Sequence, residues 1–424
     1  MVVGRGGREH ALAWRLARDP EVESVTLAPG NRSAASRFGS LPVDETDGAA
    51  VTRVCRDAGA TLAVIGPESS LAAGVVDALT EAGIPAYGPT REAARIESSK
   101  WFAKEIMTEA NVPTARATRC STVAAALAAL ADYPAPWVIK ADGLAAGKGV
   151  LVSADRSQVE AFIRSCLEAQ KFGEQGAVIV IEEYLSGEEV SVMAVCDGAR
   201  HALLPSARDH KRARDGDQGP NTGGMGAFAP APRLDDAGAM DVSRRVIAPV
   251  LDRLAARGTP FRGTLYAGLM LTAAGPRVLE FNARFGDPET QVVMPLIDGS
   301  LARLLDSAAR GALDAEAIRT HVGAAVGVTL VDEGYPERVQ GTGTIEGLER
   351  VENHDTFVFH AGTAPEGARW KVTGGRAATI VARRTTLAAA RAAAYEAVDR
   401  LSGNGWRCRR DIAEGNAVVT GGRA

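Results

Sequence analysis

Short apolar runs alternate with helical patterns through the first hundred residues. Apolar, β-rich runs predict strands at Met1–Val3, Val25–Ala28 and Thr61–Ile65, and apolar residues at helical spacing predict helices at Glu9–Arg18 and Leu71–Ala82. This alternation indicates a parallel sheet with helices on its faces, and such sheets bind ligands at the carboxyl ends of their strands. The turns expected at that edge are Gly4-Arg5-Gly6-Gly7, Pro29-Gly30-Asn31 and Gly66-Pro67-Glu68.

The pattern changes near residue 98 and again near residue 312. Between these points it predicts helices at Ser99–Ala110 and 241–257, a hairpin turning at Asp197-Gly198, and strands at Leu265–Thr272 and Arg277–Asn282. The last part, rich in Val, Thr and Gly, predicts further strands and a closing helix over 387–401. A chain of 424 residues with three such regions is expected to form a multidomain α/β and α+β protein.

Composition narrows the class of protein. Hydrophobic residues make up 46% and charged residues 24% of the chain, as in folded water-soluble proteins. No window approaches the roughly 18 consecutive apolar residues of a membrane helix, and the apolar start is too short for a signal peptide. The formal net charge of −4 argues against nucleic acid as the main partner. Five scattered cysteines indicate a reducing compartment rather than a disulfide frame. We therefore expect a cytoplasmic enzyme that works as a monomer without nucleic acid or membrane.

Lysine is rare in this chain. Only seven of the 48 basic residues are lysines, and four of them, Lys100, Lys104, Lys140 and Lys148, fall between residues 100 and 148. Arginine fills nearly every other cationic position, so a retained lysine indicates a need for a compact point charge on a thin stem. Chance is the alternative for any one lysine, but the grouping favours function.

The strand, glycine turn and helix over residues 3–10 form a candidate phosphate site. Unpaired amide N–H groups and the positive end of the helix dipole attract phosphate at such turns. The turn lacks the third glycine of the dinucleotide fingerprint, and no acid ends the second strand at 28–31, which argues against NAD. A tight turn without a ligand is the alternative.

A second motif, KADGLAAGKGV, runs from Lys140 to Val150. It places a loop of small residues between two lysines and between two predicted strands. It is not a Walker A loop, because Gly149 replaces Ser or Thr and a strand follows instead of a helix. A mobile glycine lid of this kind can hold a γ-phosphate through backbone amides and exclude water. The alternative is a flexible hairpin with incidental lysines.

Two further motifs end apolar strands. In the first, the strand 179–182 leads into Glu183-Tyr184-Leu185 and then Glu189, where backbone groups could hold adenine and an acid could accept from ribose hydroxyls; edge-strand glutamates with no ligand are the alternative. In the second, alternation places Glu280, Asn282 and Arg284 on one face and Leu279, Phe281 and Ala283 on the other. Hard oxygen ligands suit Mg²⁺, and the arginine can stabilise charge on a transferring phosphoryl group. A solvated polar face is the alternative.

The order of these motifs resembles that of the ATP-grasp ligases and, within them, the phosphoribosylamine–glycine ligase (glycinamide ribonucleotide synthetase) family. The resemblance runs essentially end to end, in GGREHALAW at 6–14, APGN at 28–31, GPE at 66–68, KADGLAAGKGV at 140–150, DHKR at 209–212, GPNTGGMGAFAP at 219–230, EFNARFGDPETQ at 280–291, FHAGT at 359–363 and CRRDIA at 408–413.

The resemblance implies three domains. They are a parallel α/β domain over 1–97 that precedes the ATP-grasp fold, a two-lobed ATP-grasp domain over 98–312 with a mobile lid lobe at about 114–187, and a small β-rich α+β domain over 313–424. It also implies the reaction: ATP, glycine and 5-phosphoribosylamine give glycinamide ribonucleotide, ADP and phosphate through a glycyl phosphate, in the second step of de novo purine synthesis.

The resemblance also implies residue roles. ATP is expected to contact Lys104, Lys140, Gly143, Gly147, Lys148, Glu182, Tyr184, Leu185 and Glu189. Mg²⁺ or Mn²⁺ is expected at Glu280 and Asn282. The catalytic residues are expected to be Arg284, Lys148 and Asp209. The substrate side is expected to include Gly6, Gly7, Arg8, Glu9, Asn31, Glu68, Lys371 and Arg376.

Two departures from the family pattern give further expectations. The first strand is a few residues shorter than usual, so either the start is misassigned or the edge of that strand frays. The strand 265–271 lacks the acid that many ATP-grasp enzymes use as another metal ligand, so phosphates and water are expected to complete the metal's coordination. Rival hypotheses are an ATP-grasp ligase that uses bicarbonate or formate and a nucleotide-binding regulatory protein without turnover.

Overall fold

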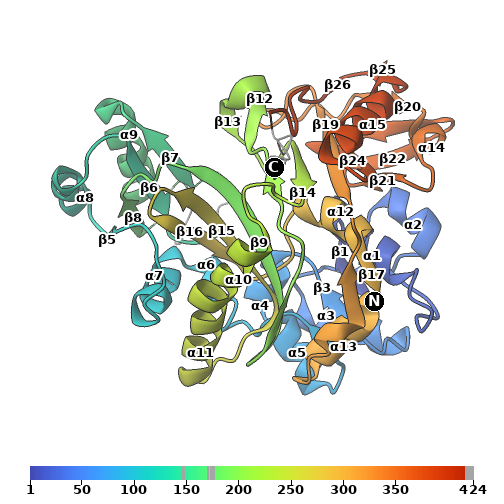
Figure 1. The fold of residues 1–424 in the computed structure, drawn as a ribbon, viewed down its shortest axis with the longest axis horizontal. Coiled ribbons are helices and arrows are strands. Elements are labelled where there is room, and N and C mark those ends of the chain that lie inside the picture. The colour runs from blue at the N-terminus through green and yellow to red at the C-terminus, as the bar shows by residue number, and fades with distance from the viewer. Residues whose placement is uncertain (145–148, 170, 172–176, 416–424) are drawn as a thin grey trace, which may run out of the picture.

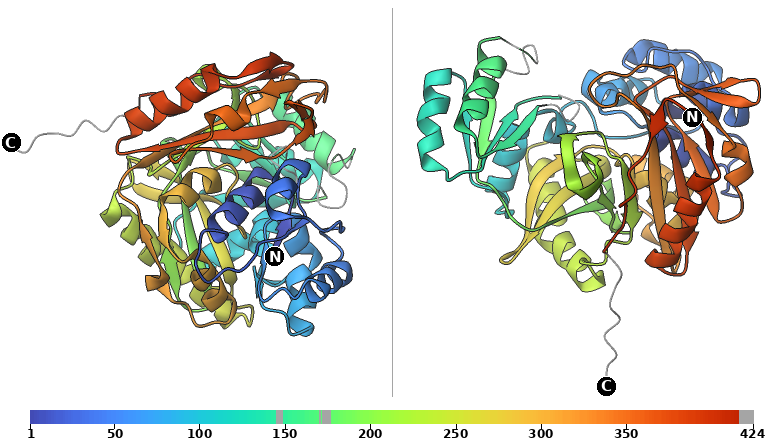
Figure 2. Two further views of the ribbon diagram at one scale, coloured as in Figure 1. Left: turned by 90° about the vertical axis from the view of Figure 1, so that its right-hand side faces the viewer. Right: turned by 90° about the horizontal axis from the view of Figure 1, so that it is seen from above.

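The computed structural model describes residues 1–144, 149–169, 171 and 177–415. Figure 1 shows an N-terminal α/β part, a lid lobe that projects to the left, a central sheet, and a C-terminal part with long strands and a helix on its outer side. The two views of Figure 2 show that the lid lobe stands apart from both terminal parts. No helix among the described residues is long and apolar enough to cross a membrane.

The N-terminal part is a four-stranded parallel sheet in the order β2-β1-β3-β4, with helices packed around it. Its elements are β1 (Val2–Gly4), α1 (Gly7–Leu16), β2 (Leu27–Pro29), α2 (Arg32–Phe38), α3 (Gly48–Asp57), β3 (Ala63–Ile65), α4 (Glu68–Ala73), α5 (Val75–Glu81), β4 (Ala86–Tyr87) and α6 (Arg95–Ser98). The parallel sheet predicted from the alternation is confirmed.

Two details of this part differ from expectation. The single helix predicted at Leu71–Ala82 is wrong, because Gly74 at φ +83° ends α4 in a left-handed conformation and α5 begins after it. The expected fraying of the first strand is also wrong. Strand β1 lies inside the sheet between β2 and β3, and Val2 and Val3 are fully buried.

The lid lobe is an antiparallel sheet in the order β5-β8-β6-β7 with two helices against it. Helix α7 (Lys100–Glu109) precedes it, and Ser99 accepts a hydrogen bond from Phe102 N as the N-cap. The lobe contains β5 (Ala117–Cys120), α8 (Val123–Ala129), a 3₁₀ turn (Leu130–Asp132), β6 (Trp137–Ala141), β7 (Val150–Ser153), α9 (Arg156–Leu167) and β8 (Ile179–Glu182).

The central part is a second antiparallel sheet in the order β10-β9-β15-β16. Its elements are β9 (Glu188–Asp197), β10 (His201–Leu203), β11 (Arg208–Asp209), β12 (Arg212–Arg214), a 3₁₀ turn (Asp215–Asp217), β13 (Gln218–Asn221), β14 (Gly226–Ala229), α10 (Asp236–Val242), a π turn (Ser243–Ile247), α11 (Ala248–Ala256), β15 (Arg262–Thr272), β16 (Gly275–Asn282), α12 (Glu289–Val293), a 3₁₀ turn (Met294–Leu296), β17 (Ile297–Gly299) and α13 (Leu301–Ala309). The hairpin predicted at Asp197-Gly198 joins β9 to β10.

The C-terminal part is built on the antiparallel sheet β11-β14-β19-β24-β21 and a smaller sheet, β22-β23-β20-β25. Its elements are a 3₁₀ turn (Ala315–Ala317), β18 (Ile318–Thr320), β19 (Ala324–Asp332), β20 (Thr344–Glu346), α14 (Leu348–Val351), β21 (Thr356–His360), β22 (Thr363–Glu366), β23 (Arg369–Val372), β24 (Arg376–Arg384), α15 (Leu387–Asp399), β25 (Ser402–Asn404) and β26 (Trp406–Arg407). Strands β11 and β14 belong to this sheet although they precede residue 313. The middle of the chain therefore contributes two strands to the sheet of the C-terminal part.

Candidate active site

A buried carboxylate gathers two lysines beneath the lid lobe. Glu182 at the end of β8 lies 3.2 Å from Lys104 Nζ and 2.9 Å from Lys140 Nζ, one lysine on each of its oxygens. Lys104 comes from α7 and also donates to Thr114 Oγ1 and Ala115 O, whereas Lys140 comes from β6 and donates to Leu279 O. Burial lowers the pKa of Lys104 to about 8 against the opposing charge of Glu182. The arrangement holds two cations side by side against one buried carboxylate.

The base of the glycine loop is fastened to the same region. Lys100 on α7 donates from Nζ to Gly143 O at 2.9 Å, and Asp142 accepts from Trp101 N and Ser99 Oγ. Gly147 and Lys148, which were predicted to contact ATP, lie outside the described residues.

The predicted adenine hinge lies beside a small apolar cluster. Leu185 packs with Ala115 and Met270, and Leu279 covers them, while Tyr184 is half exposed. The predicted face of Leu279 is wrong, because a β-bulge breaks the register between β15 and β16. Gly268 pairs with Glu280, but Leu269 pairs with Val278, so Leu279 is an extra residue and leaves the side of Phe281.

Glu280 and Asn282 lie near the end of β16, and Arg284, two residues beyond it, is held by carboxylates. Its Nε lies 3.2 Å from Glu68 Oε2, and its NH2 lies 3.0 Å from Glu97 Oε1 and donates to Asn282 Oδ1 at 3.2 Å. Glu97 also accepts from Ala283 N at 2.7 Å. Despite the cost of burial, the carboxylates raise the pKa of Arg284 above its ordinary value, so the guanidinium stays charged.

Lys211 links the predicted ribose and metal carboxylates. Its Nζ lies 3.0 Å from Glu189 Oε2 and 4.0 Å from Glu280 Oε1. Burial raises the pKa of Asp209 to about 7 against the attraction of Lys211. Behind them, Glu289 is buried and accepts hydrogen bonds from Ser191 Oγ at 3.0 Å and Tyr266 Oη at 2.8 Å.

The N-terminal glycine turn lies near Arg284, and a negative charge of the protein, the Glu9 carboxylate, is already bound to it. Glu9 is buried, and its carboxylate accepts from Gly6 N at 2.6 Å, which caps the start of α1, and from Arg8 Nε at 2.5 Å. The prediction that the turn offers only unpaired amides is therefore wrong for Gly6. Glu68 lies 3.8 Å from Arg8 and joins this turn to Arg284. The two arginines lower the pKa of Glu68 to about 2 against the effect of burial.

Asn31 joins the N-terminal and C-terminal parts. Its Oδ1 accepts from Ala34 N as the N-cap of α2, and its Nδ2 donates to Arg5 O at 3.1 Å and to His360 O at 3.0 Å. The Asn31 side chain, which was predicted to contact substrate, therefore also connects the N-terminal glycine turn to the C-terminal part.

Of the two C-terminal cations predicted for the substrate side, the structure brings one to the site. Arg376 at the start of β24 lies 2.8 Å from Asp287 Oδ2 and also donates to Asp287 O and Gly223 O. Gln291 donates to the same Asp287 at 2.7 Å, and Gly7 lies against Gln291. Lys371 is exposed on β23, and none of the ion pairs among the described residues includes it.

Comparisons with known proteins match the whole length of this arrangement. Models of the three domains of phosphoribosylglycinamide synthetase match in chain order: the N domain at 1–97, the ATP-grasp (A) domain at 98–290 and the C domain at 325–415. The chain belongs to the phosphoribosylglycinamide synthetase family. The three-part architecture described above is the architecture of that family.

Individual members of the family cover nearly the whole chain. It is 47% identical over 417 residues to phosphoribosylamine–glycine ligase of Streptomyces coelicolor, covering 97% of this chain and 98% of that one. The Caulobacter vibrioides ligase is 44% identical over 414 residues, with 97% of each chain covered. The crystal structure of the Thermotoga maritima ligase superposes with a TM-score of 0.85 at 31% identity, covering 97% of this chain and 99% of that one.

Several residues of this phosphoribosylglycinamide synthetase site were not predicted. Glu97 sits in a stretch whose pattern carries no distinctive signal, whereas Glu289 falls inside the EFNARFGDPETQ motif but was given no role. The folded chain brings Glu97 to Arg284 and Glu289 to Tyr266. Lys100 and Lys211 did have a signal, the rarity of lysine. The structure places Lys100, Lys104, Lys140 and Lys211 in the one region between the lid lobe and the central sheet.

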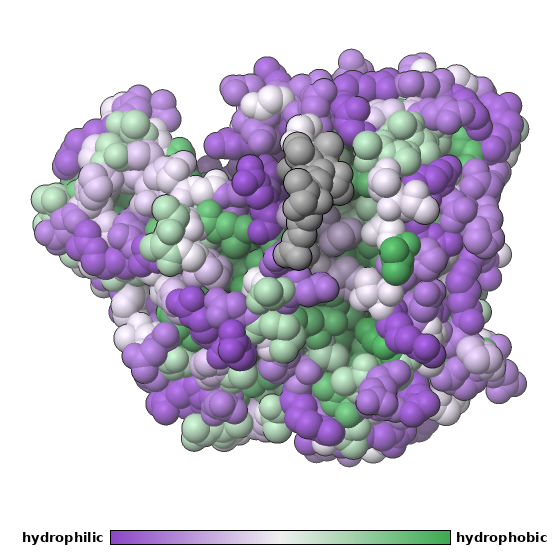
Figure 3. Space-filling model, viewed as in Figure 1, coloured by the Kyte–Doolittle hydropathy of each residue, from purple (hydrophilic) through white to green (hydrophobic). Residues whose placement is uncertain are grey.

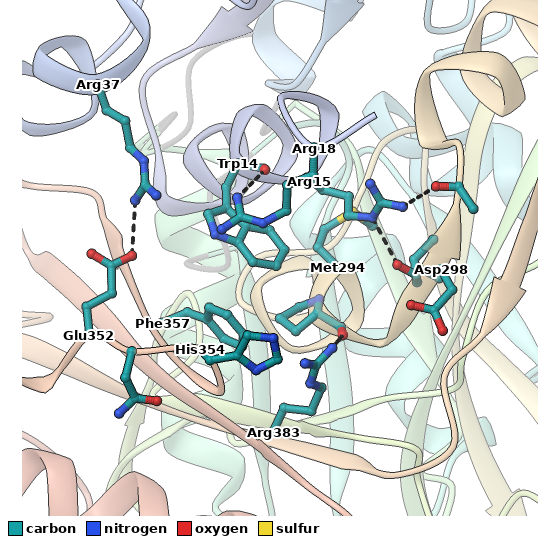
Figure 4. A pocket seen from close by; sticks show the side chains of 14 residues that line it. Trp14, Arg15, Arg18, Arg37, Met294, Asp298, Glu352, His354, Phe357 and Arg383 are labelled. Carbon is teal, nitrogen blue, oxygen red and sulfur yellow. Dashed lines mark hydrogen bonds and ion pairs between the residues drawn. The ribbon is translucent and has the colours of Figure 1, made fainter. Parts of the chain in front are cut away.

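Figure 3 shows a notch between the lid lobe and the rest of this family member. A separate cavity of about 500 Å³ lies elsewhere, between α1 and the C-terminal strands (Figure 4). Its arginines serve the protein itself: Arg15 donates to Ile297 O, Arg383 to Pro295 O, and Arg37 pairs with Glu352. The predicted site residues are not among its lining residues, so it marks a seam between domains.

The side-chain oxygens on β16 can bind a divalent metal only if other groups complete its coordination. Glu280 and Asn282 supply one carboxylate and one amide oxygen, which are hard ligands of the kind Mg²⁺ selects. The amide oxygen has a second lone pair, so its bond from Arg284 leaves it able to ligate. No group of three or more His, Cys, Asp or Glu that could hold a metal occurs among the described residues. Phosphate oxygens and water must therefore supply the rest.

Proposed function

We propose that this protein is an ATP-dependent ligase that joins glycine to 5-phosphoribosylamine, releasing glycinamide ribonucleotide, ADP and phosphate. The observation that carries the proposal is the Arg8–Glu68–Arg284 chain. It connects the N-terminal glycine turn to the strand end that bears Glu280 and Asn282. A phosphorylated amine at the turn and an ATP γ-phosphate at the strand end would therefore meet at one point.

The ATP end of the reaction follows from the cations. Lys104 and Lys140 would pair with phosphate oxygens and share Glu182 as their counter-charge. Tyr184 and Leu185 would hold adenine against the apolar cluster with Met270, and Glu189 would accept from ribose hydroxyls. Gly143, together with Gly147 and Lys148 farther along the loop, would belong to the lid that closes on the phosphates. Mg²⁺ or Mn²⁺ at Glu280 and Asn282 would neutralise phosphate charge when bound.

The chemistry proceeds in two transfers. A glycine carboxylate oxygen attacks the γ-phosphorus and ADP leaves, giving glycyl phosphate; Arg284 balances the charge on the transferring group. The amine of phosphoribosylamine then attacks the acyl carbon, and phosphate leaves as the amide forms. The amine must lose a proton in this step, and we propose Asp209, whose pKa burial raises to about 7, as the acceptor.

The substrate side is proposed to use Gly6, Gly7, Arg8, Glu9, Asn31 and Glu68 from the N-terminal part and Arg376 from the C-terminal part, with Lys371 as an outer phosphate contact. We further propose that the enzyme is a cytoplasmic monomer. The five cysteines are all free thiols, which supports a reducing compartment.

The test is coupled ADP release with Mg-ATP, glycine and phosphoribosylamine generated in situ, omitting each in turn. We expect release only when all three are present and no release when bicarbonate or formate replaces glycine. The replacement of glycine by bicarbonate is included because a Campylobacter jejuni biotin carboxylase shares the fold, with a TM-score of 0.72 at 16% identity. Release with bicarbonate, or without phosphoribosylamine, would overturn the proposed substrates. ATP binding without any release would favour a regulatory protein.

A further inference from the structure

The segment near the C-terminus reaches back to the loop that carries Lys211. This segment, residues 407–413, contains the CRRDIA motif, and the loop contains the DHKR motif. In Figure 1 the β12–β13 hairpin of this loop lies beside β26. Arg409 lies between them and is only 1% exposed, which makes it one of the largest fully buried side chains in the protein.

Four of the five N–H groups of the Arg409 guanidinium donate to oxygen atoms. Nε and NH2 donate to the two carboxylate oxygens of Asp411 at 2.7 and 2.6 Å. NH1 donates to Asp217 Oδ1 at 2.8 Å and to Arg212 O at 2.9 Å, and NH2 lies 3.2 Å from Nδ1 of His210. A planar fork with five N–H groups is required for this set, and a lysine offers three donors on one atom.

Arg409 contacts both residues that are adjacent to Lys211 in the sequence, His210 and Arg212. It faces the His210 ring on one side and binds the Arg212 carbonyl on the other. The side chain of Lys211, which stands between these two contacts, reaches other partners. Lys211 then meets Glu189 at 3.0 Å and lies 4.0 Å from Glu280.

We propose that Arg409 is a positioning residue, through which the C-terminal segment fixes the backbone around Lys211 so that its ammonium group lies between Glu189 and Glu280 when ATP binds. The inference rests on the proposed ATP site. Arg409 itself contacts no substrate in this account, because it is buried and four of its five N–H groups donate to oxygen atoms of the protein.

Other contacts keep the hairpin attached when Arg409 is changed. Asp411 accepts from Gly216 N at 2.8 Å, Arg410 N donates to Asp215 Oδ1 at 2.8 Å, and Arg407 donates to Ala213 O at 2.7 Å. These bonds hold the far end of the hairpin. Loss of Arg409 therefore removes its contacts on His210 and Arg212 together with its ion pairs to Asp217 and Asp411, while these other bonds keep the loop docked.

The experiment is a double-mutant cycle on turnover in the full-length protein. Arg409→Gln is combined with Lys211→Ala, and Arg410→Gln is the matched control, because the Arg410 side chain is exposed and pairs with Asp399 at the surface. We expect Arg409→Gln to lower kcat roughly 10–100-fold, as misplacement of a site group does, and Arg410→Gln to leave it unchanged. On the Lys211→Ala background, Arg409→Gln should lower kcat by less than about twofold, since the residue it positions is already gone.

The outcomes separate positioning from general stability. Effects of Arg409→Gln and Lys211→Ala that multiply would overturn the inference, as would wild-type turnover in Arg409→Gln. Thermal unfolding is recorded for each variant, and Arg409→Lys is put through the same cycle if Arg409→Gln does not fold. The wild-type assay with each substrate omitted tests the proposed reaction by itself, so failure of the reaction and failure of the coupling are distinguishable.

Discussion

Arg284 is the residue on which the proposed chemistry depends most directly. It is held by Glu68, Glu97 and Asn282 at 3.0–3.2 Å, so its position is fixed before any substrate arrives. Such preorganised charge lowers a barrier because no reorganisation is needed when the reaction occurs. Because of the same contacts, removing Arg284 also takes this ion pair away from Glu97, a carboxylate with little access to water.

We expect Arg284→Ala to lower kcat by about 10²-fold or more while ATP affinity changes little. It should also reduce the free energy of unfolding by roughly 3–5 kcal/mol, as loss of one partner of a buried ion pair does. Steady-state kinetics, nucleotide titration and denaturant unfolding measure the three quantities. Arg245→Ala is the control, because Arg245 pairs at the surface with Asp241. Turnover within a few-fold of wild type would contradict the assigned role.

Lys104 gives a pH prediction. Its pKa of about 8 is below the ordinary value of 10.5, so the unfolded chain binds more protons between these pH values. The contribution of Lys104 to the free energy of unfolding should therefore rise as pH increases from about 8 to 10.5. ATP affinity should move in the opposite direction, because neutral Lys104 no longer attracts phosphate.

The measurement is the apparent Kd for ATP between pH 7 and 9.5 in wild type and in Lys104→Arg. Arginine stays charged over this range, so the variant should lose the decline that wild type shows as pH passes about 8. Equal slopes in the two proteins would show that another group titrates.

At the scale of elements, the turn between β1 and α1 is held together by one side chain. The Glu9 carboxylate fills the space between Gly4, Gly6 and Gly66, and a Cβ on Gly66 would lie 2.0 Å from Glu9 Oε1. Gly66 is thus needed for space rather than for its backbone angles. Glu9 in turn orients Arg8, which faces Glu68.

We expect Gly66→Ala to reduce the free energy of unfolding by about 1–3 kcal/mol, the usual cost of overpacking, and to raise KM for phosphoribosylamine more than KM for ATP. Gly59→Ala is the control, because a Cβ there meets open space and costs only the strain of its φ of +63°. If both variants raise the two KM values equally, the turn does not bind phosphoribosylamine.

The same elements show how far sequence alone can lead. Period-two and helical patterns predicted the parallel sheet, α1, α7, the strands around β16 and the face shared by Glu280 and Asn282. They missed the break at Gly74 and the bulge at Leu279, because a single residue changes the register there while hydrophobicity continues. Glu97 and Arg409 were missed for a different reason. Arg284, the partner of Glu97, and Asp217, one partner of Arg409, lie more than a hundred residues away, so no local pattern signals these pairings, although Arg409 stands in the CRRDIA motif.

At the scale of the molecule, the buried apolar residues form several clusters, and some of these clusters lie within one part of the chain while others join several parts. One buried cluster contains only lid-lobe residues, from Cys120 to Ile181. Another joins all the remaining parts, from Val2 on β1 to Val381 on β24, and includes Trp14 against Phe357 at 4.8 Å between ring centres. The lid lobe therefore has a core of its own. The C-terminal part also has a separate cluster, from Met225 to Ala413, but it shares the cluster that contains Trp14 and Phe357 with the N-terminal part.

We predict that the lid lobe unfolds separately and that the rest unfolds as one unit. Ile163 and Leu304 are fully buried, one in each cluster, and truncation of either to alanine should cost about 2–5 kcal/mol. In hydrogen exchange, Ile163→Ala should lower protection in the lid lobe alone, and Leu304→Ala should lower it in both terminal parts. Mg-ADP at 100 times its Kd should restore about 2.7 kcal/mol to the lid lobe of Ile163→Ala, because ADP would bridge the lobe to the central sheet. Equal loss of protection over the whole chain in both variants would instead make the protein a single cooperative unit, and lid closure would then have to occur without local unfolding.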